Sequence, residues 1–80
     1  MQCVYVLRSL RDGKFYVGLT NDVRRRLAQH NAGKVRATEG RRPFEIVQVE
    51  EFEDQSEVAR RERYLKSEIG REELKTLLSH

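Results

Sequence analysis

The fold is decided by residues 3–19, which read CVYVLRSLRDGKFYVGL. Residues 3–7 and 15–19 are rich in apolar, aromatic and β-branched side chains, a composition typical of strands. The dipeptide Asp12-Gly13 lies between them and is a strong signal for a tight turn. The stretch therefore predicts an antiparallel hairpin.

The alternation of side chains along a strand predicts which hairpin residues share a face. A loop with an even number of residues places Tyr5, Tyr16 and Gly18 on one face. With a loop of four residues, Tyr5 lies opposite Gly18 and Leu7 opposite Tyr16, so the two tyrosines are diagonal neighbours about 7–8 Å apart at Cα. They are either ordinary packing residues or members of a polar site. Gly18, which has no side chain, leaves room for the backbone of a ligand.

The rest of the chain predicts one strand and three helices. Capping side chains at 20–22 precede a helix over 23–30 that ends near Gly33, and a basic loop over 33–43 contains two glycines, four basic residues and the single proline. A third strand is expected over 44–49, a helix from Asp54 or Ser56 to about Ser67, and a shorter helix from about Arg71 to Leu78, after which the last residues should fray. This order predicts an α+β domain, a small three-stranded sheet with helices, over residues 1–80.

Length and composition exclude several classes of protein. Eighty residues allow one domain. The longest apolar run has five residues, far from the roughly 20 that span a membrane, and no signal peptide is recognisable. A single cysteine, Cys3, makes neither an internal disulfide nor a structural zinc site; we expect it to be a small buried hydrophobe in a cytoplasmic protein.

The charges are distributed unevenly along the chain. Residues 1–42 carry ten Lys and Arg against three Asp and Glu, whereas residues 43–80 carry six against ten. Arginine supplies twelve of the sixteen basic groups, and its planar fork suits phosphate. The basic half indicates a polyanion partner, most simply nucleic acid, or else a soluble protein with a strongly charged surface.

Polar residues occupy positions where helical periodicity predicts core. In the helix after Asp54, an apolar stripe runs from Val58 to Leu65 and Ile69. The stripe position between Val58 and Leu65 is Glu62. A buried carboxylate is costly unless it is paired or binds a cation. Glu62 is therefore an ion-pair member, a side chain whose end reaches water, or a ligand.

The predicted first helix also has polar residues at or within its apolar stripe. Val23 and Leu27 define its apolar stripe, and Arg26 and His30, four residues apart, share a face at or within that stripe. His30 is either a buried histidine with satisfied hydrogen bonds or a site residue. Together with both tyrosines and the glutamate, these groups predict a polar cluster of the kind that catalysis requires.

At this point the sequence resembles a known family. Cys3-Val4-Tyr5, ten intervening residues and Tyr16-Val17-Gly18 resemble the paired motif of the GIY-YIG nucleases, although Cys3-Val4 stands where Gly-Ile is usual. Arg26 with His30 resembles the family's next motif, and residues 60–66 resemble its segment with a metal-binding glutamate. The resemblance covers about residues 3–66 and is nearest to small stand-alone members related to the excinuclease nuclease domain. It implies a three-stranded antiparallel sheet flanked by helices, in the order already deduced.

The resemblance implies a metal-dependent endonuclease that hydrolyses DNA phosphodiester bonds, structure-selective or weakly sequence-specific, in DNA repair or recombination. Glu62 would hold one divalent ion, Mg²⁺ or Mn²⁺, and Arg26 would bind a phosphate oxygen. Tyr16 would orient the attacking water and deprotonate it as phenolate, while His30 would either hydrogen-bond Tyr5 or take the proton itself.

The basic residues expected to hold the DNA backbone, branched or single-stranded, are Arg24, Arg25, Lys34, Arg36, Arg41 and Arg42. No appended DNA-binding domain is expected, so a partner protein is a candidate source of specificity, and no membrane is involved. Two alternatives remain: a non-catalytic nucleic-acid-binding module of the same fold, and a protein-interaction adaptor with solvating charges.

Overall fold

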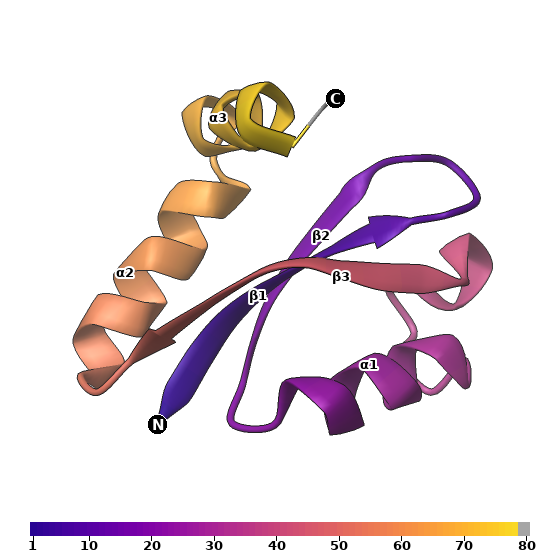
Figure 1. The fold of residues 1–80 in the computed structure, drawn as a ribbon, viewed down its shortest axis with the longest axis horizontal. Helices are drawn as coiled ribbons and strands as arrows, with labels where there is room; N and C mark the ends of the chain where they lie inside the picture. Colours follow the sequence, from indigo (N-terminus) through magenta and orange to yellow (C-terminus); the bar gives the residue numbers. More distant parts are fainter. Residues whose placement is uncertain (79–80) are drawn as a thin grey trace.

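The computed structural model describes residues 1–78 as a three-stranded sheet with helices on both faces (Figure 1). In chain order the elements are β1 (Gln2–Ser9), β2 (Phe15–Thr20), α1 (Val23–Asn31), the 3-10 helix η1 (Glu39–Arg41), β3 (Phe44–Phe52), α2 (Gln55–Lys66) and α3 (Glu68–Leu78). The predicted α+β class and the order of strands and helices are confirmed. The fraying expected at the end of the chain includes positions 79–80, which lie outside the described residues.

The hairpin has the predicted register. The backbone N–H of Ser9 donates to the carbonyl of Lys14 at 2.9 Å, which closes a loop of four residues. Gly13 has a φ of 74°, a conformation that side chains with a Cβ rarely adopt. Tyr5 consequently pairs with Gly18. β1 is the central strand, in the order β2-β1-β3, so β2 has an open edge.

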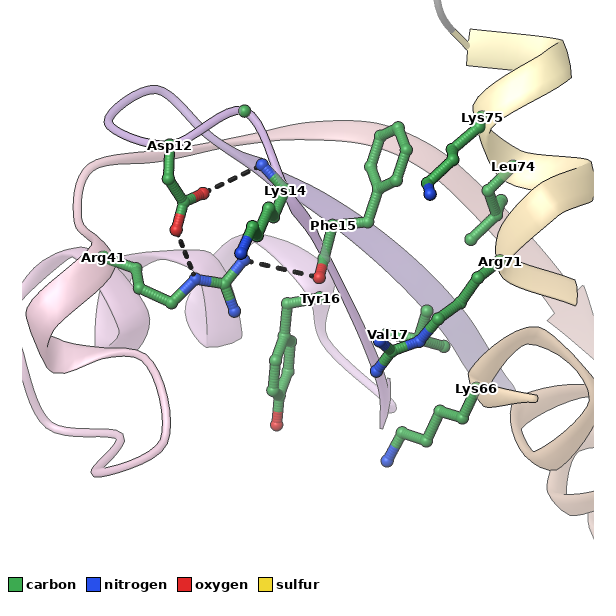
Figure 2. Close-up of a pocket in the computed structure, with 11 residues that line it drawn as sticks. Asp12, Lys14, Phe15, Tyr16, Val17, Arg41, Lys66, Arg71, Leu74 and Lys75 are labelled. Carbon is green, nitrogen blue, oxygen red and sulfur yellow. Dashed lines mark hydrogen bonds and ion pairs between the residues drawn. The ribbon is translucent and has the colours of Figure 1, made fainter. Parts of the chain in front are cut away.

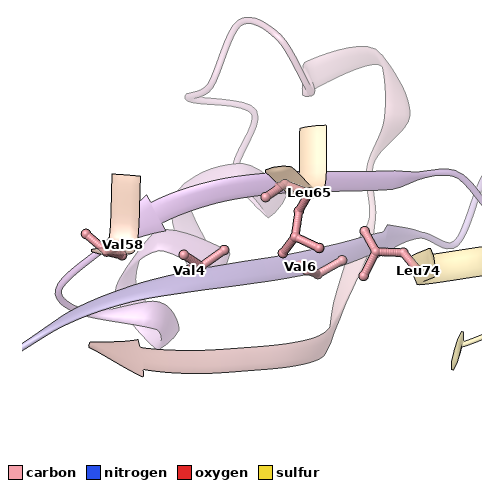
Figure 3. Close-up of a cluster of buried hydrophobic side chains, with 6 residues drawn as sticks. Val4, Val6, Val58, Leu65 and Leu74 are labelled. Carbon is pink, nitrogen blue, oxygen red and sulfur yellow. The ribbon is translucent and has the colours of Figure 1, made fainter. Parts of the chain in front are cut away.

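The alternating side chains of the sheet divide the core into two clusters. Val4 and Val6 pack with α2 and α3 on one face, where the buried contacts are made by Val58, Leu65 and Leu74 (Figure 3). Tyr5 and Leu7 point to the other face, which α1 covers. The sheet therefore separates the helix that carries His30 from the helix that carries Glu62.

Two aspartates cap the N-termini of the helices that carry the candidate site residues. Asp22 accepts a hydrogen bond from the N–H of Arg25 at 3.1 Å and caps α1. Asp54, rather than Ser56, caps α2 by accepting from the N–H of Ser56 at 2.7 Å. These caps satisfy backbone donors that have no partner within the helix.

Three predicted features differ in the structure. β3 continues to Phe52 rather than stopping at residue 49, because β1 pairs with it along its whole length. α3 begins at Glu68 rather than near Arg71. Ile69 was expected in the core but is 72% exposed: α2 ends at Lys66, so the helical stripe does not continue to it.

Candidate active site

Tyr5 is at the centre of the candidate site. It lies on the central strand and is 1% exposed, and its ring lies over Gly18 on β2. A Cβ at Gly18 would come within 2.5 Å of the Tyr5 hydroxyl. The space that the sequence suggested for a ligand backbone is therefore occupied by the Tyr5 ring, and that expectation is wrong.

His30 is fully buried and hydrogen-bonded at both ring nitrogens. Its Nε2 lies 2.9 Å from the Tyr5 hydroxyl, and its Nδ1 lies 2.7 Å from the Thr38 hydroxyl. Thr38 also donates to the carbonyl of Val35 at 3.3 Å. With that proton directed to Val35, Thr38 accepts from Nδ1–H, and Tyr5 donates to the unprotonated Nε2.

Arg26 completes this chain at the surface. Its Nε–H donates to the Tyr5 hydroxyl at 3.4 Å, and its Nη1 donates to Gln29 at 3.0 Å. The guanidinium also borders a cavity of about 260 Å³ between the end of β2 and the start of α1. Tyr5 thus connects a buried imidazole to a guanidinium that a solvent-borne anion can reach.

The protonation states follow from burial. Burial, and then the charge of Arg26, lower the pKa of His30 to about 4. Burial raises the pKa of Tyr5, although the hydrogen bond from Arg26 acts in the opposite direction. At neutral pH His30 is therefore an uncharged acceptor and Tyr5 a protonated donor, in agreement with the hydrogen bonds.

Tyr16 lies beside this buried pair. Its ring centroid is 6.3 Å from that of Tyr5 and 4.9 Å from that of His30. It is half-buried and lines a second cavity, of about 610 Å³, so a water molecule has access to it. The predicted neighbourhood of the two tyrosines is confirmed by this packing.

Glu62 approaches from the opposite face. Its carboxylate binds the Lys66 ammonium at 2.9 Å, and its side chain is 22% exposed. Lys66 lines the cavity that Tyr16 lines, and the charge of Glu62 is among the influences that raise the pKa of Tyr5. Glu62 is thus related to the site through Lys66 and through its charge, and among residues 1–78 no hydrogen bond or ion pair joins it to Tyr5, Tyr16, Arg26 or His30.

The described residues contain no group of three potential metal-ligating side chains. A Mg²⁺ ion often uses one carboxylate, several waters and the phosphate of its substrate. A single half-buried carboxylate such as Glu62 fits that pattern, with Lys66 as the cation that an ion would replace.

Five of the six predicted backbone-binding residues are exposed, and the sixth is partly buried. Arg24, Arg25, Lys34, Arg36 and Arg42 are exposed. Arg41 is half-buried, binds Asp12 at 3.0 Å and donates to the carbonyl of Phe15 at 3.4 Å. Arg41 thus ties the loop before β3 to the hairpin.

Two site residues were not found from the sequence. Thr38 is a single threonine in a basic loop and gives no periodic signal, yet it is fully buried against His30. Gln29 could have been found, because it lies three residues after Arg26 on α1 and faces it.

The comparisons with known proteins identify the family of this domain. The GIY-YIG catalytic domain matches residues 1–75. A UPF0213 protein of Halobacterium salinarum is 45% identical over 67 residues, which cover 82% of this chain and 86% of that protein. Another, from Oceanobacillus iheyensis, is 40% identical over 75 residues, covering 92% and 86%.

A solved structure shows the same fold. The solution NMR structure of a UPF0213 protein from Bacillus halodurans superposes with a TM-score of 0.58 at 38% identity, covering 98% of this chain and 86% of the other. The family match and the fold imply a nuclease-type domain. The chain belongs to the GIY-YIG catalytic-domain family, and its relatives are small stand-alone UPF0213 proteins.

No helix among residues 1–78 combines the length and the apolar character that a membrane crossing needs.

Proposed function

We propose that this protein is a metal-dependent endonuclease that hydrolyses DNA phosphodiester bonds, with structure-selective or weak sequence specificity suited to repair or recombination. The observation that carries the proposal is the chain of hydrogen bonds from buried His30 through Tyr5 to Arg26. An apolar core does not need this chain of hydrogen bonds. The chain orients the Arg26 guanidinium toward solvent.

Arg26 has the role of binding the scissile phosphate. Its Nε is held by Tyr5 and its Nη1 by Gln29, so Nη2 has no hydrogen-bond partner among residues 1–78. A guanidinium held in this way stabilises the negative charge that develops on phosphate oxygens without having to reorganise. Tyr5 and His30 are positioning residues in this proposal, because both are buried away from substrate.

Tyr16 has the role of orienting the attacking water. It is the site tyrosine that lines a cavity, whereas Tyr5 is fully enclosed and His30 has no exposed surface. His30 is unsuited to receive the proton of the water directly, since both its nitrogens already have partners. Tyr16 remains the candidate base.

Glu62 is the proposed ligand of one Mg²⁺ or Mn²⁺ ion. A bound divalent ion supplies charge stabilisation on the phosphate and on the leaving oxygen. The contribution of this chain would be to present the Glu62 carboxylate next to Lys66, which lines the Tyr16 cavity, and to release it from that ion pair.

The test compares cleavage by the wild-type protein and by Glu62→Gln. Branched, nicked and single-stranded DNA substrates are incubated with Mg²⁺, with Mn²⁺ and with chelator. We expect metal-dependent cleavage by the wild type and by Glu57→Gln, an exposed carboxylate on the same helix, and none by Glu62→Gln. Equal cleavage by wild type and Glu62→Gln would indicate a contaminating nuclease and contradict the proposal.

The alternative function is a non-catalytic nucleic-acid-binding module. The ion pair of Glu62 with Lys66 favours it, since the carboxylate already has a cation. This alternative predicts binding that weakens steeply with salt, together with no cleavage under any metal condition.

A further inference from the structure

A basic surface lies at the open edge of β2. Here the cavity of about 610 Å³ separates the hairpin from α3 (Figure 2). Its lining includes Tyr16 and Val17, which are successive strand residues and point to opposite faces of the sheet. The cavity therefore crosses the edge of β2 and joins the Tyr16 side of the site to the α3 side.

The lining is strongly positive. Five of its residues are basic and one is acidic: Lys14, Arg41, Lys66, Arg71 and Lys75 against Asp12. Nearby carboxylates compensate part of this charge: Asp12 binds Arg41, Glu62 binds Lys66, and Glu72 lies 3.5 Å from Lys75.

Two of the basic side chains have no such compensation. Lys14 and Arg71 are both exposed, and neither forms an ion pair or a side-chain hydrogen bond with another residue of the described range 1–78. In Figure 2, Arg71 extends from α3 toward the strand that carries Val17. An anion in the cavity would meet two cations that have no ion-pair partner among residues 1–78.

The position of Arg71 is set by the packing around it. A Cβ at Gly70 would collide with the carbonyl oxygen of Tyr64, so the absence of a side chain there lets α3 begin close against the end of α2. Leu74, fully buried, anchors the next turn. A cation in the first turn of a helix opposes the helix dipole, so the dipole of α3 does not account for Arg71.

We propose that this cavity binds the phosphodiester backbone of the nucleic-acid strand that continues from the scissile phosphate. Tyr16 lines the cavity and packs against Tyr5, whose hydroxyl accepts from Arg26, and the proposed strand would run from Arg26 along β2 to Lys14 and Arg71. The inference rests on the proposed function and adds α3 to the substrate-binding surface. A cavity of this volume also suits a small phosphorylated compound, so the test separates these two sources of phosphate.

The experiment measures binding without cleavage. A fluorescein-labelled single-stranded oligonucleotide is titrated in chelator with the wild type, Lys14→Gln, Arg71→Gln and the double variant, and anisotropy gives Kd over a series of salt concentrations. Arg63→Gln removes an exposed arginine outside the cavity and is the matched control. Circular dichroism confirms that each variant is folded.

We expect each single substitution to weaken binding about fivefold, and each lost phosphate contact to reduce the slope of log Kd against log salt by about 0.7. Arg63→Gln should bind as the wild type does. An unchanged Kd and slope in the folded double variant would overturn the inference, even where the wild type cleaves DNA. The two proposals can fail separately. If the wild type never cleaves DNA but the double variant binds the oligonucleotide more weakly, strand binding in the cavity is supported and only the endonuclease is refuted.

A competition arm identifies the source of the phosphate. Pyrophosphate and a nucleoside triphosphate are added to the oligonucleotide complex at matched ionic strength. Displacement by another oligonucleotide, with little effect of the small compounds, supports a polynucleotide strand. Displacement by pyrophosphate at concentrations comparable to the oligonucleotide, lost in the double variant, would instead assign the cavity to a small phosphorylated ligand.

Discussion

Lowering the pH from 7 to 4 should destabilise the folded chain through His30. The pKa of His30 is about 4 in the folded state, because the ring is buried and faces Arg26, and 6.5 in an exposed histidine. Below pH 6.5 the unfolded chain therefore binds a proton that the folded chain does not. The stability that neutral His30 provides is complete above pH 6.5 and is lost as the pH falls toward 4.

The magnitude follows from the difference between the two pKa values. Each pH unit in this window costs about 1.4 kcal/mol per proton, so the whole change is about 3 kcal/mol. This is a large part of the stability of a small domain. Asp12 and Asp54 have lowered pKa values because they accept hydrogen bonds from Lys14 and Ser56, and they add their losses below their ordinary pKa of 3.8.

The assay is urea unfolding at pH 7, 5.5 and 4, followed by circular dichroism. His30→Gln retains an amide that can hydrogen-bond but does not titrate, so it is the control. We expect the free energy of unfolding to fall between pH 7 and 4 by about 3 kcal/mol more in the wild type than in His30→Gln.

An NMR titration of the imidazole tests the cause directly. The expected midpoint for the ring of the folded chain is near pH 4. A midpoint near 6.5, or an equal loss of stability in wild type and variant, would refute the buried neutral histidine and with it the direction of the Tyr5 hydrogen bond.

Two further predictions concern the surroundings of His30. Thr38→Val should lower the free energy of unfolding by about 1–3 kcal/mol, because it leaves Nδ1–H of His30 buried without an acceptor. Thr38→Ser keeps the hydroxyl and should cost less than the valine. Equal stability of the wild type and both variants in urea would show that His30 has another partner. Gly18→Ala should lower the free energy of unfolding by about 1–3 kcal/mol in the same assay and reduce any cleavage, since the added methyl displaces the Tyr5 ring. A fully stable and active variant would mean that the ring can move aside.

The fold could be predicted because its signals are local. The Asp12-Gly13 turn and the alternation of side chains predict the hairpin and the face of Tyr5, and the register of the structure confirms both. Each capping aspartate directly precedes its own helix, and Arg26 and His30 lie about one helical turn apart. Such features depend on neighbours in sequence, and a single chain displays them without knowledge of the rest of the molecule.

The structure alone decided which polar groups meet. The buried partner of His30 is Thr38, from a loop whose sequence shows no pattern, because a hydrogen bond across a chain reversal depends on how the loop closes. Ile69 is exposed because α2 ends at Lys66, a consequence of the packing of α3 against α2 around Gly70. By itself the sequence determined the strands, the helices and the residue types available for chemistry. The packing of α1 and α2 on opposite faces of the sheet decided that Glu62 lies on the other side of the sheet from His30, because contacts between distant segments are set by the shape of the whole core.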